Sequence, residues 1–214
     1  AFKDLALSIL GGLLSKSLEK CGIDEPVLVL TATSGDTGSA ALAGLGGQQG
    51  IRIAVIYPAE GTSEIQKLQM TSVPLEDRCV IGLKGTFDDA QRAVKNIFQS
   101  AKDPRSPFFG IRLSSANSIN IGRLLPQIVY YVKAWRDLYS LGAIDYGGAF
   151  DVVVPSGNFG DILAARYAKA MGLPIRRLVC ASNSNRILYD LFATGIYDRR
   201  RSFNKTISPS MDIL

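Results

Sequence analysis

The chain has no histidine among its 214 residues. Histidine is the side chain that most often moves protons near neutral pH, and it is a common metal ligand. Its absence excludes Ser-His-Asp and Cys-His catalysis and histidine-held metal sites built from this chain alone. Proton transfer must therefore use lysine, a carboxylate, tyrosine, a thiol or a cofactor.

Cysteine is also scarce. Cys21, Cys79 and Cys180 lie far apart, and none belongs to a close Cys-x-x-Cys pair. This usage indicates neither a disulfide framework nor a zinc site, so we expect no metal and a reducing, cytoplasmic location. The sequence has no apolar run long enough to span a bilayer, and its first residues predict no secretory or transit segment. We therefore expect no membrane partner.

Dense basic clusters are almost missing, although the formal net charge is +5. The basic residues are scattered except for the run from Asp198 to Arg201, and no aromatic residues interleave with it. We therefore expect no nucleic-acid partner. A mild basic excess also suits an enzyme that collects phosphorylated substrates.

What the sequence does contain is an alternation of short apolar runs with amphipathic stretches. Strands are expected at 27–33, 51–57, 78–83, 151–155 and 175–181, and helices at 4–20, 39–45, 63–70, 87–101, 120–139, 160–171 and 185–193. This order predicts an α/β fold with a mostly parallel sheet, helices on both faces and three layers. Pro126 predicts a bend within 120–139. The glycine-containing stretch 142–148 is the best candidate for an internal boundary, and the tail 195–214 shows weak periodicity.

One local pattern occurs twice: an apolar run ends in Ser-Gly, a short glycine-bracketed loop follows, and a helix begins. The copies are Ser34-Gly35-Asp36-Thr37-Gly38 and Ser156-Gly157-Asn158-Phe159-Gly160-Asp161. Such turns expose N–H groups at a helix N-terminus, which favours an anion. Neither matches the dinucleotide fingerprint or the P-loop. One such loop is more often a plain turn with a helix cap, but two of matching form favour a site that grips an anionic ligand.

Two further groups of residues could carry chemistry. Lys3 is either a solvated charge or, where burial lowers its pKa, an amine that forms a Schiff base and carries protons. A donor-rich group lies at a predicted helix start and consists of Asn117, Ser118, Asn120 and Arg123. Ser118 or Asn120 could cap that helix with Arg123 solvated, or the group could bind a phosphate.

Several segments together resemble the threonine synthases, in order and over essentially the whole chain. They are residues 1–4 (Ala-Phe-Lys-Asp), 31–41, 115–120, 155–161 and 208–213. The resemblance is closer to the microbial and fungal type than to the plant-like type. It implies a pyridoxal-phosphate enzyme of fold type II, the fold shared with the tryptophan synthase β subunit. The implied reaction converts O-phospho-L-homoserine and water to L-threonine and phosphate.

The resemblance also implies roles for individual residues. Lys3 matches the Schiff-base lysine, and the loop from Gly157 through Asn158, Phe159 and Gly160 to Asp161 matches the cradle of the cofactor phosphate. Asp36 falls where many relatives place an asparagine near the cofactor's 3′ oxygen, and an ionised aspartate cannot donate a hydrogen bond there. Ser34, Gly35 and Thr37 would hold the substrate's carboxylate. The substrate's phosphate would contact Asn117, Ser118, Asn120 and Arg123.

The resemblance further implies that residues 1–214 are a fragment of the cofactor-binding catalytic region. The family's N-terminal part and the later segment that contacts the pyridine nitrogen have no counterpart in the chain. Two alternatives stay open: a threonine-synthase-like phospho-lyase, and a catalytically silent α/β module that holds a phosphorylated metabolite. The oligomeric state is not predicted.

Overall fold

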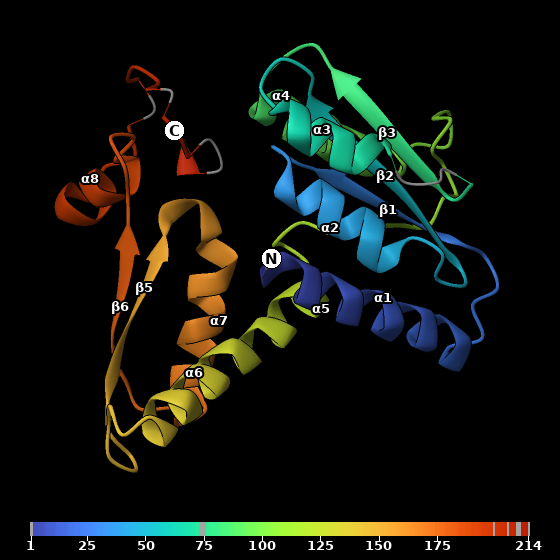
Figure 1. Cartoon of the computed structure of the whole chain (residues 1–214). Coiled ribbons are helices and arrows are strands. Elements are labelled where there is room, and N and C mark those ends of the chain that lie inside the picture. The colour runs from blue at the N-terminus through green and yellow to red at the C-terminus, as the bar shows by residue number, and fades with distance from the viewer. Residues whose placement is uncertain (1, 73–75, 199, 205, 209–210, 214) are drawn as a thin grey trace. The chain divides into compact units, whose positions relative to one another are not determined.

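The computed structural model describes residues 2–72, 76–198, 200–204, 206–208 and 211–213. The chain divides into two compact units, Ala1–Pro126 and Gln127–Leu214. Ala1, Pro209 and Ser210, which belong to segments of the threonine synthase resemblance, lie outside the described residues. The labelled elements of both units can be followed in Figure 1.

Unit 1 is built on a parallel sheet with the strand order β3-β2-β1-β4. Its strands are β1 (Val27–Ala32), β2 (Ile51–Pro58), β3 (Arg78–Leu83) and β4 (Leu113–Ser115). In register, Val27 of β1 lies opposite Ile51 of β2, and Leu30 lies opposite Ser115 of β4. Because all pairs are parallel, the carboxyl ends of the strands meet at one edge of the sheet.

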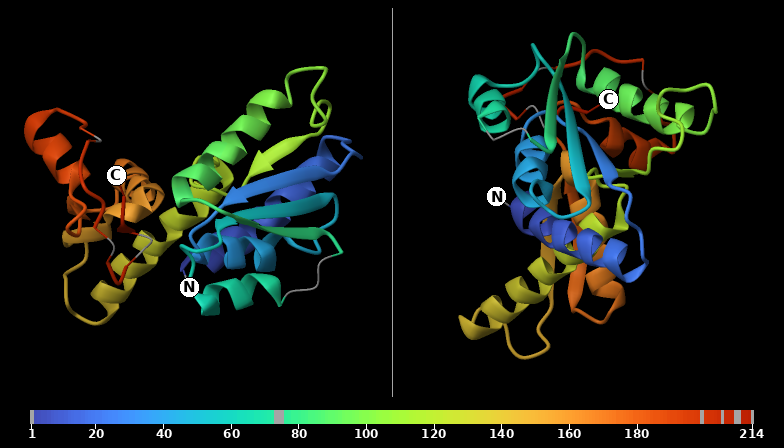
Figure 2. Two further views of the ribbon diagram at one scale, coloured as in Figure 1. Left: turned by 90° about the horizontal axis from the view of Figure 1, so that it is seen from above. Right: turned by 90° about the vertical axis from the view of Figure 1, so that its right-hand side faces the viewer.

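Helices cover both faces of this sheet, because side chains alternate between faces along each strand. Val29, Ile53 and Val55 pack into one core with α1 (Phe2–Lys20), α2 (Asp36–Leu45) and Met70 of α3 (Glu64–Thr71). Leu30 and Ile56 pack into a second core with α4 (Phe87–Ser100). Figure 2 shows α4 on one side of the sheet and α1 to α3 on the other.

A close glycine contact joins α1 to α2. A Cβ at Gly11 would lie 2.3 Å from the carbonyl oxygen of Gly44, and a Cβ at Gly44 would lie 2.7 Å from the backbone of Leu7 and Ser8. The two helix backbones therefore approach to a distance that side chains at these positions would prevent.

Unit 2 contains the parallel pair β5 (Phe150–Pro155) and β6 (Ile175–Ala181). Its helices are α6 (Ile128–Ser140), α7 (Phe159–Ala170) and α8 (Ile187–Thr194). The weakly periodic tail is organised by one carboxylate: Asp212 accepts hydrogen bonds from Asn183 Nδ2 at 2.7 Å and from the Thr206 N–H at 2.8 Å. Polar pairing, rather than an apolar stripe, holds this segment.

The expected α/β fold with parallel strands and covering helices is confirmed, and some elements differ in detail. The expected helix 120–139 is instead α5 (Ile121–Leu124), the 3₁₀ turn η1 (Leu125–Gln127) and α6. Pro126 interrupts it, since proline has no N–H and its ring clashes with the preceding turn. The strand β4 was not predicted, because three residues are too short for a periodic pattern.

The division between the units falls after Pro126 and not at the expected 142–148 stretch. That stretch lies between α6 and β5, and it is fixed by local contacts. Trp135 Nε1 donates a hydrogen bond to the Gly148 carbonyl at 3.2 Å, and the Tyr146 ring packs edge-on against the rings of Trp135 and Tyr139. The glycine-containing stretch 142–148 is therefore an ordered turn and not a boundary between units.

No helix among the described residues combines the length and the apolar character needed to cross a membrane.

Candidate functional site

Lys3 lies in the first turn of α1 and is almost entirely buried, with 8% of the residue exposed. Its Nζ is 3.8 Å from Oδ2 of Asp36. Burial lowers the pKa of Lys3, the negative charge of Asp36 opposes that shift, and the positive charge of Arg123 adds to it. The amine therefore loses its proton more readily than a solvated lysine, which suits it to act as a nucleophile or a proton carrier.

Asp36 is the first residue of α2 and follows Gly35, whose φ is +148°. A carboxylate at this position is stabilised by the positive end of the helix dipole. Its Oδ1 accepts a hydrogen bond from Nε2 of Gln66 in α3 at 2.7 Å. Gln66 is not among the residues predicted from the sequence. The available signal was its place three residues after Ser63, the N-cap of α3, in a Ser-x-x-Gln capping pattern.

The first glycine loop uses some of its own donors. The buried Thr33 hydroxyl accepts hydrogen bonds from the N–H groups of Gly35 and Gly38, both at 2.9 Å. These N–H groups are therefore engaged by protein rather than presented to an anion. Gly35 and Thr37 are buried, Ser34 is half-buried and Asp36 is exposed. The loop follows β1 at the carboxyl edge of the sheet, where ligands of open α/β sheets bind.

The donor-rich group after β4 is largely committed to the backbone. The Asn117 amide pairs with both backbone groups of Ala32. Asn120 caps α5 by accepting from the Gly122 N–H at 2.9 Å, and its Nδ2 donates to the Ser115 carbonyl at 2.7 Å. Capping by Asn120 is thus confirmed. Ser118 is exposed.

Arg123 is not solvated, so that part of the capping alternative is wrong. Only 5% of the residue is exposed, and Nη1 donates a hydrogen bond to the Ala116 carbonyl at 2.9 Å. The packing of α5 against α1 brings the guanidinium close enough to act on the charge of Lys3. Unit 1 therefore gathers Lys3, Asp36 and Arg123 from α1, α2 and α5.

The second glycine loop belongs to unit 2. Residues Ser156–Asn158 form a 3₁₀ turn, and α7 begins at Phe159. Ser156 is 2% exposed, and its buried Oγ finds no hydrogen-bond partner among the described residues. Leaving a buried hydroxyl unpaired is costly. A ligand oxygen beside this turn would satisfy it, so the turn fits a phosphate-bearing group.

The remaining residues of this loop are placed around the start of α7. Gly157 and Phe159 are exposed, Asn158 is half-buried and Gly160 is buried. The Tyr131 hydroxyl of α6 donates a hydrogen bond to the Asp161 carbonyl at 3.1 Å. Burial raises the pKa of Tyr131, with the charge of Asp161 adding to the shift. Tyr131 therefore stays a protonated donor that fixes the first turn of α7 on α6.

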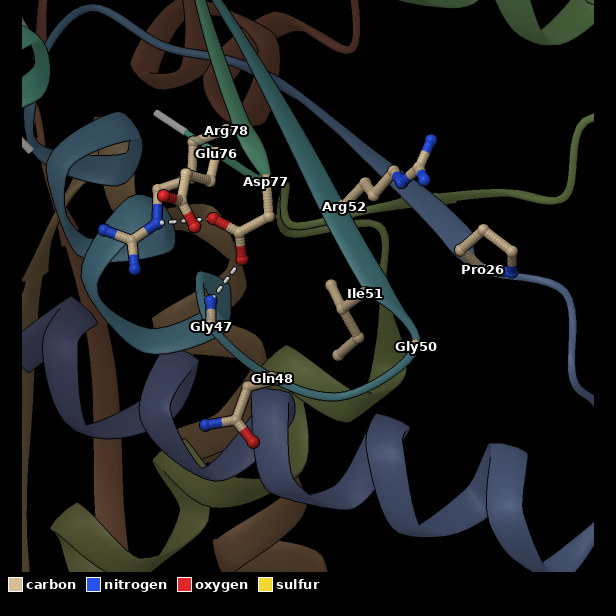
Figure 3. A pocket seen from close by; sticks show the side chains of 9 residues that line it. All are labelled: Pro26, Gly47, Gln48, Gly50, Ile51, Arg52, Glu76, Asp77 and Arg78. Atoms are coloured by element: carbon tan, nitrogen blue, oxygen red, sulfur yellow. Dashed lines mark hydrogen bonds and ion pairs between the residues drawn. The ribbon is translucent and has the colours of Figure 1, made fainter. Parts of the chain in front are cut away.

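A separate cavity of about 560 Å³ lies at the opposite, amino edge of the unit 1 sheet, beside the starts of β2 and β3. Figure 3 shows Asp77 accepting a hydrogen bond from the Gly47 N–H and pairing with the neighbouring Arg78. Arg78 Nε lies 3.2 Å from Asp77 Oδ1. None of the predicted site residues lines this cavity. It is therefore distinct from the site around Lys3. No group of Cys, Asp and Glu side chains in the described part of the chain could hold a metal ion.

No protein-family model matches the chain. Over its whole length it is 44% identical to human threonine synthase-like 1 and 42% identical to threonine synthase of Saccharomyces cerevisiae. The crystal structure of PLP-bound threonine synthase from Brucella melitensis is similar with a TM-score of 0.80 and 40% identity, over 99% of the chain. The chain spans 30%, 41% and 43% of the lengths of these proteins, respectively.

Proposed function

Because the chain is homologous to the threonine synthases along its whole length, we propose that it acts as a pyridoxal-phosphate-dependent lyase of that type. The observation that supports this most directly is the burial of Lys3 close to the charges of Asp36 and Arg123. The proposed reaction converts O-phospho-L-homoserine and water to L-threonine and phosphate. The cytoplasmic location and the lack of a nucleic-acid partner stay predictions.

The residues present fit pyridoxal phosphate. Lys3 offers a buried amine with a lowered pKa for a covalent link, and Ser156 offers a buried hydroxyl that has no hydrogen-bond partner among the residues the structure describes. When bound, the cofactor would supply an electron sink that acidifies the substrate's Cα–H. Its phosphate would be held by the loop from Gly157 to Asp161, with the Ser156 hydroxyl added as a donor.

Lys3 is proposed to do the proton chemistry. Released from its covalent link, its Nζ would take protons from the substrate's Cα and then Cβ as phosphate leaves Cγ. It would return protons to Cγ and to Cα as the hydroxyl of water adds at Cβ, and the second proton of water would leave with the phosphate. A lysine performs both steps only if the amine gains and loses a proton near neutral pH, and burial lowers its pKa in that direction. Ser34 and Thr37 would hold the substrate's carboxylate at the carboxyl edge of β1. Gly35, whose N–H is bonded to Thr33, would shape the loop around it.

The four residues predicted to contact the substrate's phosphate divide into two pairs. The amides of Asn117 and Asn120 are hydrogen-bonded to the backbone. The proposed contact therefore rests mainly on the exposed Ser118 hydroxyl and on Arg123, while Asn117 and Asn120 hold the surrounding loop.

The assignment of Lys3 is tested on the protein at its full natural length, loaded with pyridoxal phosphate. It should absorb in the visible, and borohydride should fix the cofactor to the peptide that contains Lys3. Lys3→Ala should abolish the fixed label, and Lys16→Ala, an exposed lysine of the same helix, should keep it. A colourless protein, or a label that survives Lys3→Ala, would contradict the proposal.

The reaction is tested by supplying O-phospho-L-homoserine to the loaded protein. Formation of L-threonine and phosphate supports the proposed reaction. Formation of 2-oxobutyrate would instead identify a phospho-lyase, and binding without turnover would identify a silent binding module.

A further inference from the structure

Gln66 makes a contact that links α3 to the site through Asp36. The two carboxylate oxygens of Asp36 have different partners: Oδ1 accepts from Gln66 Nε2 at 2.7 Å, and Oδ2 lies 3.8 Å from Lys3 Nζ. The hydrogen bond to Gln66 is the shorter and more directional of the two interactions. The Asp36 side chain is 48% exposed, and an ion pair with an exposed partner contributes little to stability on its own. The ion pair with Lys3 is therefore not enough to hold the Asp36 carboxylate in place.

The orientation of the Gln66 amide is determined from its other end. Its Oε1 accepts a hydrogen bond from the Ser63 hydroxyl at 3.1 Å, and its backbone N–H donates to the same hydroxyl at 3.3 Å. An ionised carboxylate can only accept, so the amide nitrogen must face Asp36 and the oxygen must face Ser63. The capping arrangement of α3 therefore presents a donor to Asp36.

Gly35 provides the space for this arrangement. A Cβ at Gly35 would lie 2.3 to 2.5 Å from the amide atoms of Gln66, so the amide packs directly on the glycine. The φ of +148° at Gly35 also disfavours any other residue. The glycine that precedes α2 thus allows α3 to reach the carboxylate at the start of α2.

We propose that Gln66 is a positioning residue, which holds the Asp36 carboxylate beside the Lys3 amine. Without it, the half-exposed Asp36 side chain turns toward solvent and its attraction for the Lys3 proton is lost. Arg123 of α5, the opposing charge at Lys3, then acts with less compensation. This inference rests on the proposed function, because it assigns Gln66 a place in the environment of the reactive lysine.

The test follows the titration of Lys3 in the cofactor-free, full-length protein, by NMR of lysine labelled with ¹³C at Cε. Lys3→Arg identifies the resonance by its loss. Gln66→Met keeps the length and packing of the side chain and removes the donor, and we expect it to lower the titration midpoint of Lys3. Gln69→Met, an exposed glutamine of the same helix, is the matched control and should leave the midpoint unchanged.

A double-mutant cycle separates positioning from general damage to the fold. Asp36→Asn should also lower the midpoint, and Gln66→Met should then add no further shift. If Gln66→Met folds poorly, Ser63→Ala replaces it. This variant removes the hydroxyl that orients the Gln66 amide, and it should also lower the titration midpoint of Lys3. An unchanged midpoint in both Gln66→Met and Ser63→Ala, or an equal shift with and without Asp36, would overturn the proposal. Because no cofactor is present, this outcome is independent of whether Lys3 becomes labelled.

Discussion

Asn117 and Ala32 are joined through both ends of one side-chain amide. Asn117 Oδ1 accepts from the Ala32 N–H at 3.0 Å, and Nδ2 donates to the Ala32 carbonyl at 2.8 Å. This pair continues the contact between β1 and β4 beyond the last residues of the β4 strand. It fixes the backbone immediately before the first glycine loop. Asn117, which is predicted to contact substrate, therefore supports the loop through its backbone.

Asn117→Asp tests this pair with almost no change in shape. The variant loses the donor to the Ala32 carbonyl and places a carboxylate oxygen against it. We expect a loss of about 1–3 kcal/mol in the free energy of unfolding at neutral pH. Urea denaturation measures it, and Asn96→Asp, an exposed asparagine in α4, is the matched control. Equal effects in the two variants would mean that the Ala32 pair contributes nothing specific.

Alanine substitutions at Gly11 and Gly12, two neighbouring glycines of α1, should have opposite effects on stability. At Gly11 the added Cβ meets the carbonyl oxygen of Gly44 at 2.3 Å, whereas at Gly12 nothing lies within 4 Å. We expect Gly11→Ala to cost about 1–3 kcal/mol of stability through overpacking. Gly12→Ala should instead stabilise by up to about 1 kcal/mol, because alanine has the higher helix propensity. Thermal unfolding measures the change in stability of each variant. A change of the same sign in both would argue against the close approach of α1 and α2.

Arg123→Met removes the cation that opposes protonation of Lys3. We expect the titration midpoint of Lys3 to rise, the direction opposite to that for Asp36→Asn, because a nearby positive charge disfavours the charged amine. The variant also leaves the Ala116 carbonyl without its donor, at a cost of about 1–3 kcal/mol. NMR titration and urea denaturation measure the two effects.

Arg52→Met is the control for Arg123→Met, since Arg52 is exposed. A Lys3 midpoint that falls or stays constant in Arg123→Met would show that the guanidinium does not act on the lysine.

In unit 2, Asp151 should make stability depend on pH in acid. Hydrogen bonds from Arg176 and Arg177 hold the pKa of this carboxyl well below its usual range. A lowered folded-state pKa contributes stability that is complete above the unfolded value of about 3.9 and is lost as the pH falls through the folded value. Asp151→Asn should therefore lower the unfolding temperature at pH 7, with a difference that shrinks below about pH 4.

Asp145→Asn, an exposed carboxylate of the same unit, is the control for Asp151→Asn. Added salt should also shrink the Asp151 difference, because the Arg176 and Arg177 side chains are exposed and their ion pairs with Asp151 are screened. A difference that stays constant down to pH 2 would contradict the assigned ion pairs.

The sequence determined the order and type of most elements, because burial on two sheet faces imposes a periodicity that can be read locally. It placed β3 at Arg78–Leu83 and β6 at Ile175–Ala181, the ranges that the structure has. It missed β4, which exists only because β1 supplies its hydrogen bonds. It also predicted a single helix bent at Pro126, where the structure has the 3₁₀ turn η1, which contains Pro126, between α5 and α6.

For the candidate site, the sequence by itself identified Lys3, Asp36 and Arg123 as residues of interest, since residue type and motif carry the chemistry. Only the tertiary structure decided how they act together. The structure buries Lys3 of α1 and brings the charge of Arg123 in α5 close to it. It also forms the hydrogen bond from Gln66 in α3 to Asp36 in α2. These elements are far apart in the sequence. A pKa depends on desolvation and on charges close in space, and neither can be read from neighbours along the chain. The pairing of Asn117, a predicted substrate contact, with Ala32 likewise joins residues that lie far apart in the sequence.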